Sequence, residues 1–276
     1  SPHPRVAGDQ RAQIRAARLA CHYAPALATN HCTGLARMAR AAQGKDMTAA
    51  LAIFVKTPGL SPVKTRLAAA LGTVEATGFY RLAAAATAEV VRSCQPALTP
   101  YWAVAEAGPV AAAAWRGFAR LEQGEGDLGE RLDRVYAVLQ ARHGRALLIG
   151  ADAPQLTPAM LRAALAALDD PDTPFVLGGA SDGGFWLFGG RVPIPKSVWC
   201  TVRYSQACTA SELRTMLAAH GDVANVPMLT DVDSAASLPA LSHALATLTD
   251  PLPAQRALQD WLHTTFGRTL LTGTHA

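Results

Sequence analysis

Residues 54–66 read FVKTPGLSPVKTR, at the end of an apolar run (residues 51–55) and ahead of an Ala- and Leu-rich segment with helical spacing. This order predicts a strand, then a loop rich in Pro, and then a helix. Such loops bring backbone N–H groups and cations to one point and can hold a phosphate there. The cations here are Lys56, Lys64 and Arg66. An ordinary strand-to-helix loop with solvated cations has the same sequence features, so the choice between the two interpretations depends on the turns farther along the chain.

Strand-like and helix-like segments alternate from Met47 onward. We expect strands at residues 51–55, 101–104, 146–151, 175–178, 185–188 and 223–228. We expect helices at residues 64–71, 74–93, 127–142, 158–168 and 209–220. The alternation predicts an α/β fold, with a mostly parallel sheet flanked by helices.

The helix expected at residues 127–142 has the clearest start signal. Asp127 can cap it, with Glu130 at the third helical position, as in a capping box with Asp in the Ser/Thr role. Apolar residues follow at helical spacing and are expected to face the core: Leu128, Leu132, Val135 and Leu139.

The composition favours a soluble, cytoplasmic protein without a nucleic-acid partner. Half of the 276 residues are apolar, and no apolar run is long enough to span a bilayer. Residues 1–46 hold seven basic and two acidic side chains, so the other 230 residues carry a net charge of −1 although the whole chain is +4. A nearly neutral body does not indicate a nucleic-acid surface. The five cysteines lack C-x-x-C and zinc spacing and are expected to be reduced: Cys21, Cys32, Cys94, Cys200 and Cys208.

The two ends of the chain differ from its middle. Residues 1–46 lack Glu and show no strand pattern. A targeting peptide and a helical appendage both fit this segment, and we favour upstream sequence ahead of a natural start at Met47. Residues 47–250 are expected to form the domain, and residues 251–276 a helical tail with an amphipathic stretch at 254–266.

Carboxylates follow two of the expected strands. Asp152 comes directly after the strand at 146–151, where the carboxyl edge of an open α/β sheet binds ligands. Asp231 and Asp233 follow the last strand, and carboxylates two residues apart on extended chain point the same way. These residues suit Mg²⁺ or Mn²⁺ bound to a diphosphate. A helix start at Asp152 and a solvated loop at residues 231–233 are the alternatives.

Two glycine-containing turns are further candidates. Asp182, Gly183 and Gly184 can let backbone approach a ligand while the carboxylate accepts hydrogen bonds from sugar hydroxyls, although a tight hairpin needs the same residues. Gln123 and the glycine-rich stretch with Gly126 can pass beside a nucleobase, or they are a plain helix entry.

Together these segments resemble a known bacterial family. The motifs FVKTPGLSPVKTRLA, GDLGERL, GADAPQLTP, DGGFWL and DVDS are similar to those of the glycosyltransferase-like proteins of unassigned substrate (DUF2064 type). That family is related to 2-phospholactate guanylyltransferase. The resemblance implies a nucleotide-diphospho-sugar transferase fold of the GT-A type with a divalent metal. It further implies that Lys64 and Arg66 face nucleotide phosphates, that residues 152, 231 and 233 hold the metal, and that residues 182–184 line the donor or acceptor pocket.

The expected function is metal-dependent glycosyl transfer from a nucleotide sugar to a small-molecule acceptor. Asp182 is the candidate base for the acceptor hydroxyl, with Asp152 beside the reacting phosphates. Pro58 and Pro62 remove two backbone donors from the first loop, which favours a diphosphate guest over a triphosphate. Guanylyltransferase-like transfer to a phosphorylated small molecule is the first alternative, and a catalytically silent nucleotide-binding protein is the second.

Overall fold

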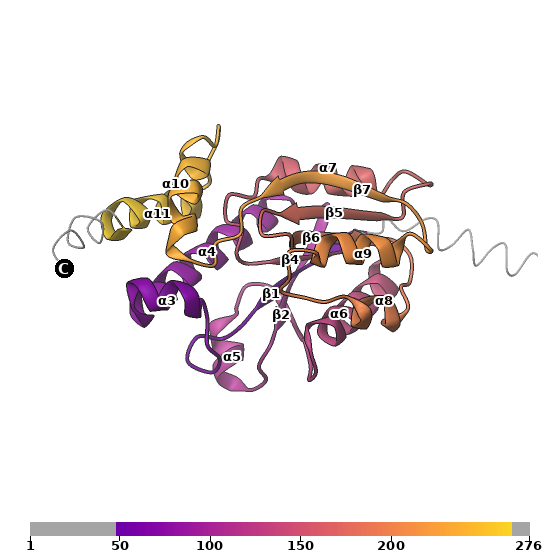
Figure 1. Ribbon diagram of the computed structural model, residues 1–276, viewed down its shortest axis with the longest axis horizontal. Coiled ribbons are helices and arrows are strands. Elements are labelled where there is room, and N and C mark those ends of the chain that lie inside the picture. Colours follow the sequence, from indigo (N-terminus) through magenta and orange to yellow (C-terminus); the bar gives the residue numbers. More distant parts are fainter. Residues whose placement is uncertain (1–47, 267–276) are drawn as a thin grey trace, which may run out of the picture. The chain divides into compact units, whose positions relative to one another are not determined.

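The structure is a computed structural model that describes residues 48–266. Its centre is a seven-stranded sheet in the order β3-β2-β1-β4-β6-β5-β7 (Figure 1). The strands are β1 (Ala49–Val55), β2 (Leu98–Val104), β3 (Ala119–Glu122), β4 (Ala146–Gly150), β5 (Phe175–Ala180), β6 (Phe185–Gly190) and β7 (Val223–Leu229). Among them β6 alone runs antiparallel to its neighbours. The predicted α/β fold with a mostly parallel sheet is confirmed.

Helices bury both faces of the sheet, which is why its central strands are apolar almost throughout. In β1, Leu51 and Ile53 belong to the core beneath α4 (Thr73–Ser93) and α7 (Pro158–Ala167). Ala50 and Ala52 point to the opposite face, whose core is covered by α6 (Leu128–His143), α8 (Lys196–Thr201) and α9 (Thr209–Leu217). The period-two alternation of strand side chains therefore divides one apolar strand between two cores.

A third core lies away from the sheet, on the outer side of α4. It joins α3 (Thr65–Leu71), α10 (Leu238–Ala246), α11 (Pro253–Trp261) and the π-helical turn η2 (Leu262–Phe266). Figure 1 shows α10 and α11 beside α3 and α4. Leu258 is fully buried in this core, as is Val232, which lies between the two aspartates of the last predicted motif.

Most predicted elements are present, with ends shifted by a few residues. The predicted helix at 209–220 ends at Leu217, and the amphipathic stretch at 254–266 forms α11 and η2. Five elements were not predicted: β3, α8, α10, α5 (Pro109–Ala114) and the short 3-10 helix η1 (Ala235–Ser237). The strand β3 reads ARLE and is largely exposed at the edge of the sheet, so it carries no apolar alternation.

The start of α6 confirms one prediction and overturns another. The Asp127 side chain accepts a hydrogen bond from the Glu130 backbone N–H at 2.9 Å, as a capping residue should. The prediction that Leu128 faces the core is wrong, because its side chain is 44% exposed. It lies in the first turn of the helix, at the edge of a cleft, whereas Leu132 and Leu139 farther along are buried.

The predictions for residues 1–46, with Cys21 and Cys32, lie outside the described residues, as does the end of the predicted tail from residue 267. Cys94, Cys200 and Cys208 are free thiols, of which Cys94 is buried and Cys200 exposed. Within residues 48–266, no helix has the length and apolar character needed to cross a membrane.

Candidate functional site

A cleft of about 720 Å³ opens at the carboxyl edge of the sheet. Its lining comes from the loops after β1, β4, β5 and β7 and from the start of β6, which reaches the same edge because β6 runs the opposite way. Ligands bind at this edge in open α/β sheets, since loops from several parallel strands meet there.

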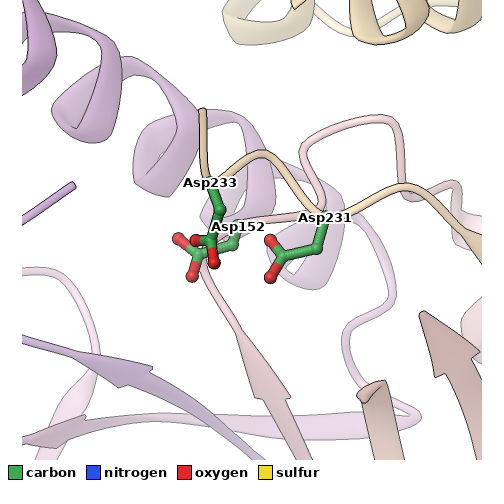
Figure 2. A group of neighbouring side chains, drawn as sticks. All are labelled: Asp152, Asp231 and Asp233. Carbon is green, nitrogen blue, oxygen red and sulfur yellow. The ribbon is translucent and has the colours of Figure 1, made fainter. Parts of the chain in front are cut away.

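Three carboxylates converge in this cleft (Figure 2). Asp152 follows β4, whereas Asp231 and Asp233 follow β7, and one oxygen of each lies within 4.8 Å of the others. Val232, between Asp231 and Asp233, holds these two aspartates in place. Its side chain is fully buried in the helical core, so the side chains of Asp231 and Asp233 both point in the opposite direction, into the cleft. The structure thus brings together carboxylates that stand about eighty residues apart in the chain.

Lys64 lies among these carboxylates rather than on the open surface of its loop. Its Nζ is 3.0 Å from Asp152 Oδ1, 3.3 Å from Asp233 Oδ1 and 4.0 Å from Asp231 Oδ1. The Lys64 side chain is only 4% exposed, and its backbone is left-handed, with φ 47°. The sequence predicted a phosphate-facing cation at this position; the structure gives the ammonium group three carboxylate partners.

The charges of this cluster do not balance. With all three carboxylates ionised, the ammonium group of Lys64 would neutralise only one of their three charges in this partly buried place. Burial lowers the pKa of Lys64, but the three carboxylates raise it by more, so its pKa lies above the ordinary value. Burial, and then the neighbouring Asp152, raise the pKa of Asp231 well above its usual range.

One oxygen of the cluster lacks a hydrogen bond. Asp231 Oδ1 is buried and makes none with the described residues. A buried carboxylate oxygen without a hydrogen bond is costly, even with the Lys64 ammonium group 4.0 Å away, and carboxylate oxygens are the ligands that divalent cations such as Mg²⁺ and Mn²⁺ prefer. The oxygen without a hydrogen bond, the spacing of the three ligands and the excess of carboxylates over cations all fit a divalent cation.

Two further cations line the cleft. Arg66 is 76% exposed and places Nη1 3.6 Å from Asp233 Oδ2. Lys56 is exposed, and its backbone N–H donates to Tyr80 Oη at 2.9 Å. Both residues line the cleft, where their charges are available to an anion. The phosphate contacts predicted for them stay a prediction.

The turn at residues 182–184 joins β5 to β6 as a tight hairpin. Asp182 lines the cleft, and its Oδ1 accepts a hydrogen bond from Gly184 N at 2.8 Å. Gly183 is absent from the cleft lining: it has φ 88°, and a Cβ there would lie 2.0 Å from the Ala207 carbonyl oxygen. Gly183 is therefore required for close backbone packing, whereas Asp182 and Gly184 border the cleft.

Gln123 has a structural use that its sequence context did not indicate. It is buried, and its amide Nε2 donates to Val55 O at 3.2 Å and to Ala103 O at 2.9 Å, which ties the ends of β1 and β2 together. It also lines the cleft, with its side-chain oxygen free of hydrogen bonds to the described residues. Gly126 does not line the cleft; its φ of 106° and the nearby Glu130 side chain explain why a glycine stands there.

Sequence reasoning missed the far wall of the cleft, the segment from Tyr204 to Ala207 between α8 and α9. Ser205 has φ 58°, and the Tyr204 hydroxyl donates to Trp199 O at 3.0 Å. The letters RYSQA contain no paired carboxylates, glycines or cations in a recognisable pattern, so no signal marked them.

Residues 81–206 match the model of a family described as "Uncharacterized protein conserved in bacteria (DUF2064)". This match confirms the predicted resemblance to a bacterial family of unassigned substrate over that part of the chain. The matched range contains Asp152 and Asp182 but neither Lys64 nor Asp231. The chain matches no curated protein.

Several solved structures are similar to the chain. One is a Desulfovibrio desulfuricans G20 protein provisionally named a nucleotide-diphospho-sugar transferase, with a TM-score of 0.71 and 23% identity over 80% of this chain and 98% of that one. This likeness confirms the predicted GT-A-like fold. A cytidylyltransferase from Leptospira borgpetersenii (TM-score 0.47, 11% identity, 80% and 96% covered) is more distant. Glucosyl-3-phosphoglycerate synthase from Mycobacterium tuberculosis, solved with Mn²⁺ and UDP, is also more distant, with a TM-score of 0.43 and 9% identity over 89% of this chain and 86% of that one.

Proposed function

We propose that the protein is a metal-dependent glycosyltransferase that uses a nucleotide-sugar donor and a small-molecule acceptor. The observation that carries the proposal is the cluster of Asp152, Asp231 and Asp233, whose oxygens lie within 4.8 Å of one another inside the cleft. An intact carboxylate cluster with cations beside it also argues against a catalytically silent relative, because a site that no longer works is not constrained to keep three like charges together.

The three carboxylates would hold Mg²⁺ or Mn²⁺, which would neutralise charge on the donor phosphates. Lys56 and Arg66, exposed in the same cleft, would bind phosphate oxygens and orient the donor. Asp182 borders the cleft from the β5–β6 turn and would accept the proton of an acceptor hydroxyl. Because its Oδ1 already accepts from Gly184 N, its Oδ2 is the atom free for that proton.

The first loop favours a diphosphate donor over a triphosphate. Its backbone N–H groups are largely occupied: Thr57 N donates to Glu106 at 2.7 Å, and Leu60 N and Ser61 N both donate to Thr57 O at 3.0 Å. Pro58 and Pro62 have no N–H at all. With these donors occupied or missing, the loop offers fewer backbone N–H groups to a triphosphate, so side chains and the metal would bind most of the phosphate oxygens.

Ligand-dependent melting tests the proposal. A ligand that binds the folded chain raises its melting temperature by mass action. We expect a panel of nucleotide sugars to raise the melting temperature in the presence of Mn²⁺ and to have little effect with EDTA. Incubation with the best donor and a panel of hydroxyl acceptors should release a nucleoside diphosphate.

Two results would contradict this function. Stabilisation by a nucleoside triphosphate, followed by pyrophosphate release when a phosphorylated acceptor is added, would show nucleotidyl transfer, the runner-up expected from the resemblance to guanylyltransferases. Nucleotide binding without turnover of any donor would instead favour a binding protein.

A further inference from the structure

Gln255, in the first turn of the C-terminal helix α11, contacts the turn that carries Asp152. Gln255 is 2% exposed, and its Nε2 donates to Pro154 O and to Leu156 O, each at 2.9 Å. Its Oε1 accepts from the backbone N–H of Leu252 at 3.0 Å. Both amide hydrogens and the oxygen are thus used, which fixes the orientation of the amide plane.

The turn needs this outside support. Residues 151–157 lie between β4 and α7, outside regular structure, and the carbonyl groups of Pro154 and Leu156 are bonded by a side chain rather than by the backbone of a helix or strand. Within the turn Leu156 N donates to Ala153 O at 3.1 Å, and Gln255 supplies two of the remaining contacts.

Helix α11, which carries Gln255, is itself fixed to α4 by a hydrogen bond and by apolar packing. The Ala254 backbone N–H donates to Glu89 Oε2, on α4, at 2.6 Å. Leu258 and Leu262 are buried against α4 in the helical core, so α11 is packed along its length. A side chain in its first turn is therefore held in place by the body of the protein.

A second glutamine joins the turn to the other carboxylates. Gln155 is 4% exposed, and its Nε2 donates at 2.7 Å to the carbonyl oxygen of Thr230, the residue before Asp231. The Asp152 turn is therefore attached on one side to α11 and on the other to the segment that bears the remaining two ligands.

We infer that Gln255 and Gln155 are positioning residues that hold the Asp152 turn in register with Asp231 and Asp233. The inference rests on the proposed function in so far as the cluster binds a metal. Gln255 stands about a hundred residues beyond the turn and touches none of the three carboxylates, so it acts through the turn alone. Losing an outer-shell partner that bonds a metal ligand directly typically weakens metal affinity about 10- to 100-fold. Because Gln255 bonds the backbone of the turn and not the ligand, we expect its loss to lie at the lower end of this range.

The test uses the full chain with Gln255→Met, which keeps the length of the side chain and removes both donors and the acceptor. Gln259→Met is the matched control, because it makes the same change one turn later on the same helix, where the side chain is only half-buried and makes no hydrogen bond with the described residues. Gln255→Asn, one methylene shorter, is a milder variant in case the first does not fold. Gln155→Met tests the second attachment.

Two readouts separate positioning from general stability. Amide hydrogen exchange without metal reports the order of residues 151–156, and an electron paramagnetic resonance titration reports the Mn²⁺ dissociation constant. In Gln255→Met we expect faster exchange confined to residues 151–156 and a roughly tenfold or larger rise in the Mn²⁺ dissociation constant. Gln259→Met should match the wild type in both.

Unchanged exchange at residues 151–156 in both Gln255 variants would overturn the inference, as would faster exchange with an unchanged Mn²⁺ affinity. A wild-type chain that binds no Mn²⁺, with or without nucleotide, would overturn the proposed function instead. In that case faster amide exchange of residues 151–156 in Gln255→Met would still show that Gln255 orders the Asp152 turn.

Discussion

The Lys64 ammonium group lies within 4.0 Å of all three carboxylates of the cluster and so affects both their stability and their affinity for a metal. It lies 3.0 Å from Asp152 Oδ1 and is almost fully buried, so it neutralises part of the charge that a metal would otherwise neutralise. A single flexible cation of this kind can stabilise the cluster without a ligand and turn to a phosphate when a metal takes its place.

This arrangement predicts opposite effects of one substitution. Lys64→Gln should destabilise the chain without metal by about 1–2 kcal/mol, because three carboxylates lose their cation while remaining partly solvated. The same variant should bind Mn²⁺ more tightly than the wild type when nucleotide is absent, since the metal no longer competes with the ammonium group. Chemical denaturation with and without Mn²⁺ measures both effects. Equal or weaker Mn²⁺ binding in the variant would contradict competition between Lys64 and the metal.

Asp152 and Asp182 should separate metal binding from acceptor activation. Asp152→Asn removes one ligand charge and should raise the Mn²⁺ dissociation constant by about tenfold or more. Little stability should be lost, because Lys64 keeps Asp233 at 3.3 Å while the remaining like charges repel less. Asp182→Asn lies outside the cluster and should leave Mn²⁺ affinity close to that of the wild type while lowering transfer. Isothermal titration with Mn²⁺ and a donor-consumption assay compare the two variants. Equal Mn²⁺ affinity in Asp152→Asn and the wild type would remove Asp152 from the ligand set.

At the level of the elements, the strands and the long helices could be predicted, because buried parallel strands leave apolar runs and α6 has a capped start. The short elements β3 and α5 could not, since four to six largely exposed residues carry no periodicity. The position of Asp152 and Asp231 at one sheet edge follows from their place after parallel strands. The hydrogen bonds of Gln255 could not be predicted, because no local pattern in α11 marks a partner a hundred residues away.

Strand β5 and the turn that follows it offer a direct comparison of two glycines, Gly179 in the strand and Gly183 in the turn. Gly183 has φ 88° and no room for a Cβ beside the Ala207 carbonyl, whereas the nearest atom to a Cβ on Gly179 is Met228 Cε at 4.0 Å. Gly183→Ala should destabilise the chain by about 2 kcal/mol or more, because it combines a strained backbone with a backbone clash. Gly179→Ala should be nearly neutral. Urea unfolding of both variants measures the difference; equal stabilities would show that the turn relaxes and that Gly183 is not required for packing.

Across the whole molecule, the three cores and the cleft are assembled from residues 48–266. Each sheet face has its own helices, and the third core fastens α10 and α11, with Gln255, to the side of α4. The cleft therefore depends on the two ends of this range together, since β1 supplies its first loop and α11 supports its Asp152 turn.

Residues 1–46 are predicted to be dispensable for folding and for binding, because they show no strand pattern and precede the alternation of strands and helices that begins at Met47. A chain that starts at Met47 should melt within about 2 °C of the full chain, a difference that corresponds to about 0.5–1 kcal/mol for a protein of this size. Its Mn²⁺ affinity should also be the same. Its formal charge changes from +4 to −1, so ion-exchange elution should shift although stability does not. Calorimetry and Mn²⁺ titration of both chains make the comparison, and a drop of several degrees would show that residues 1–46 pack on the domain.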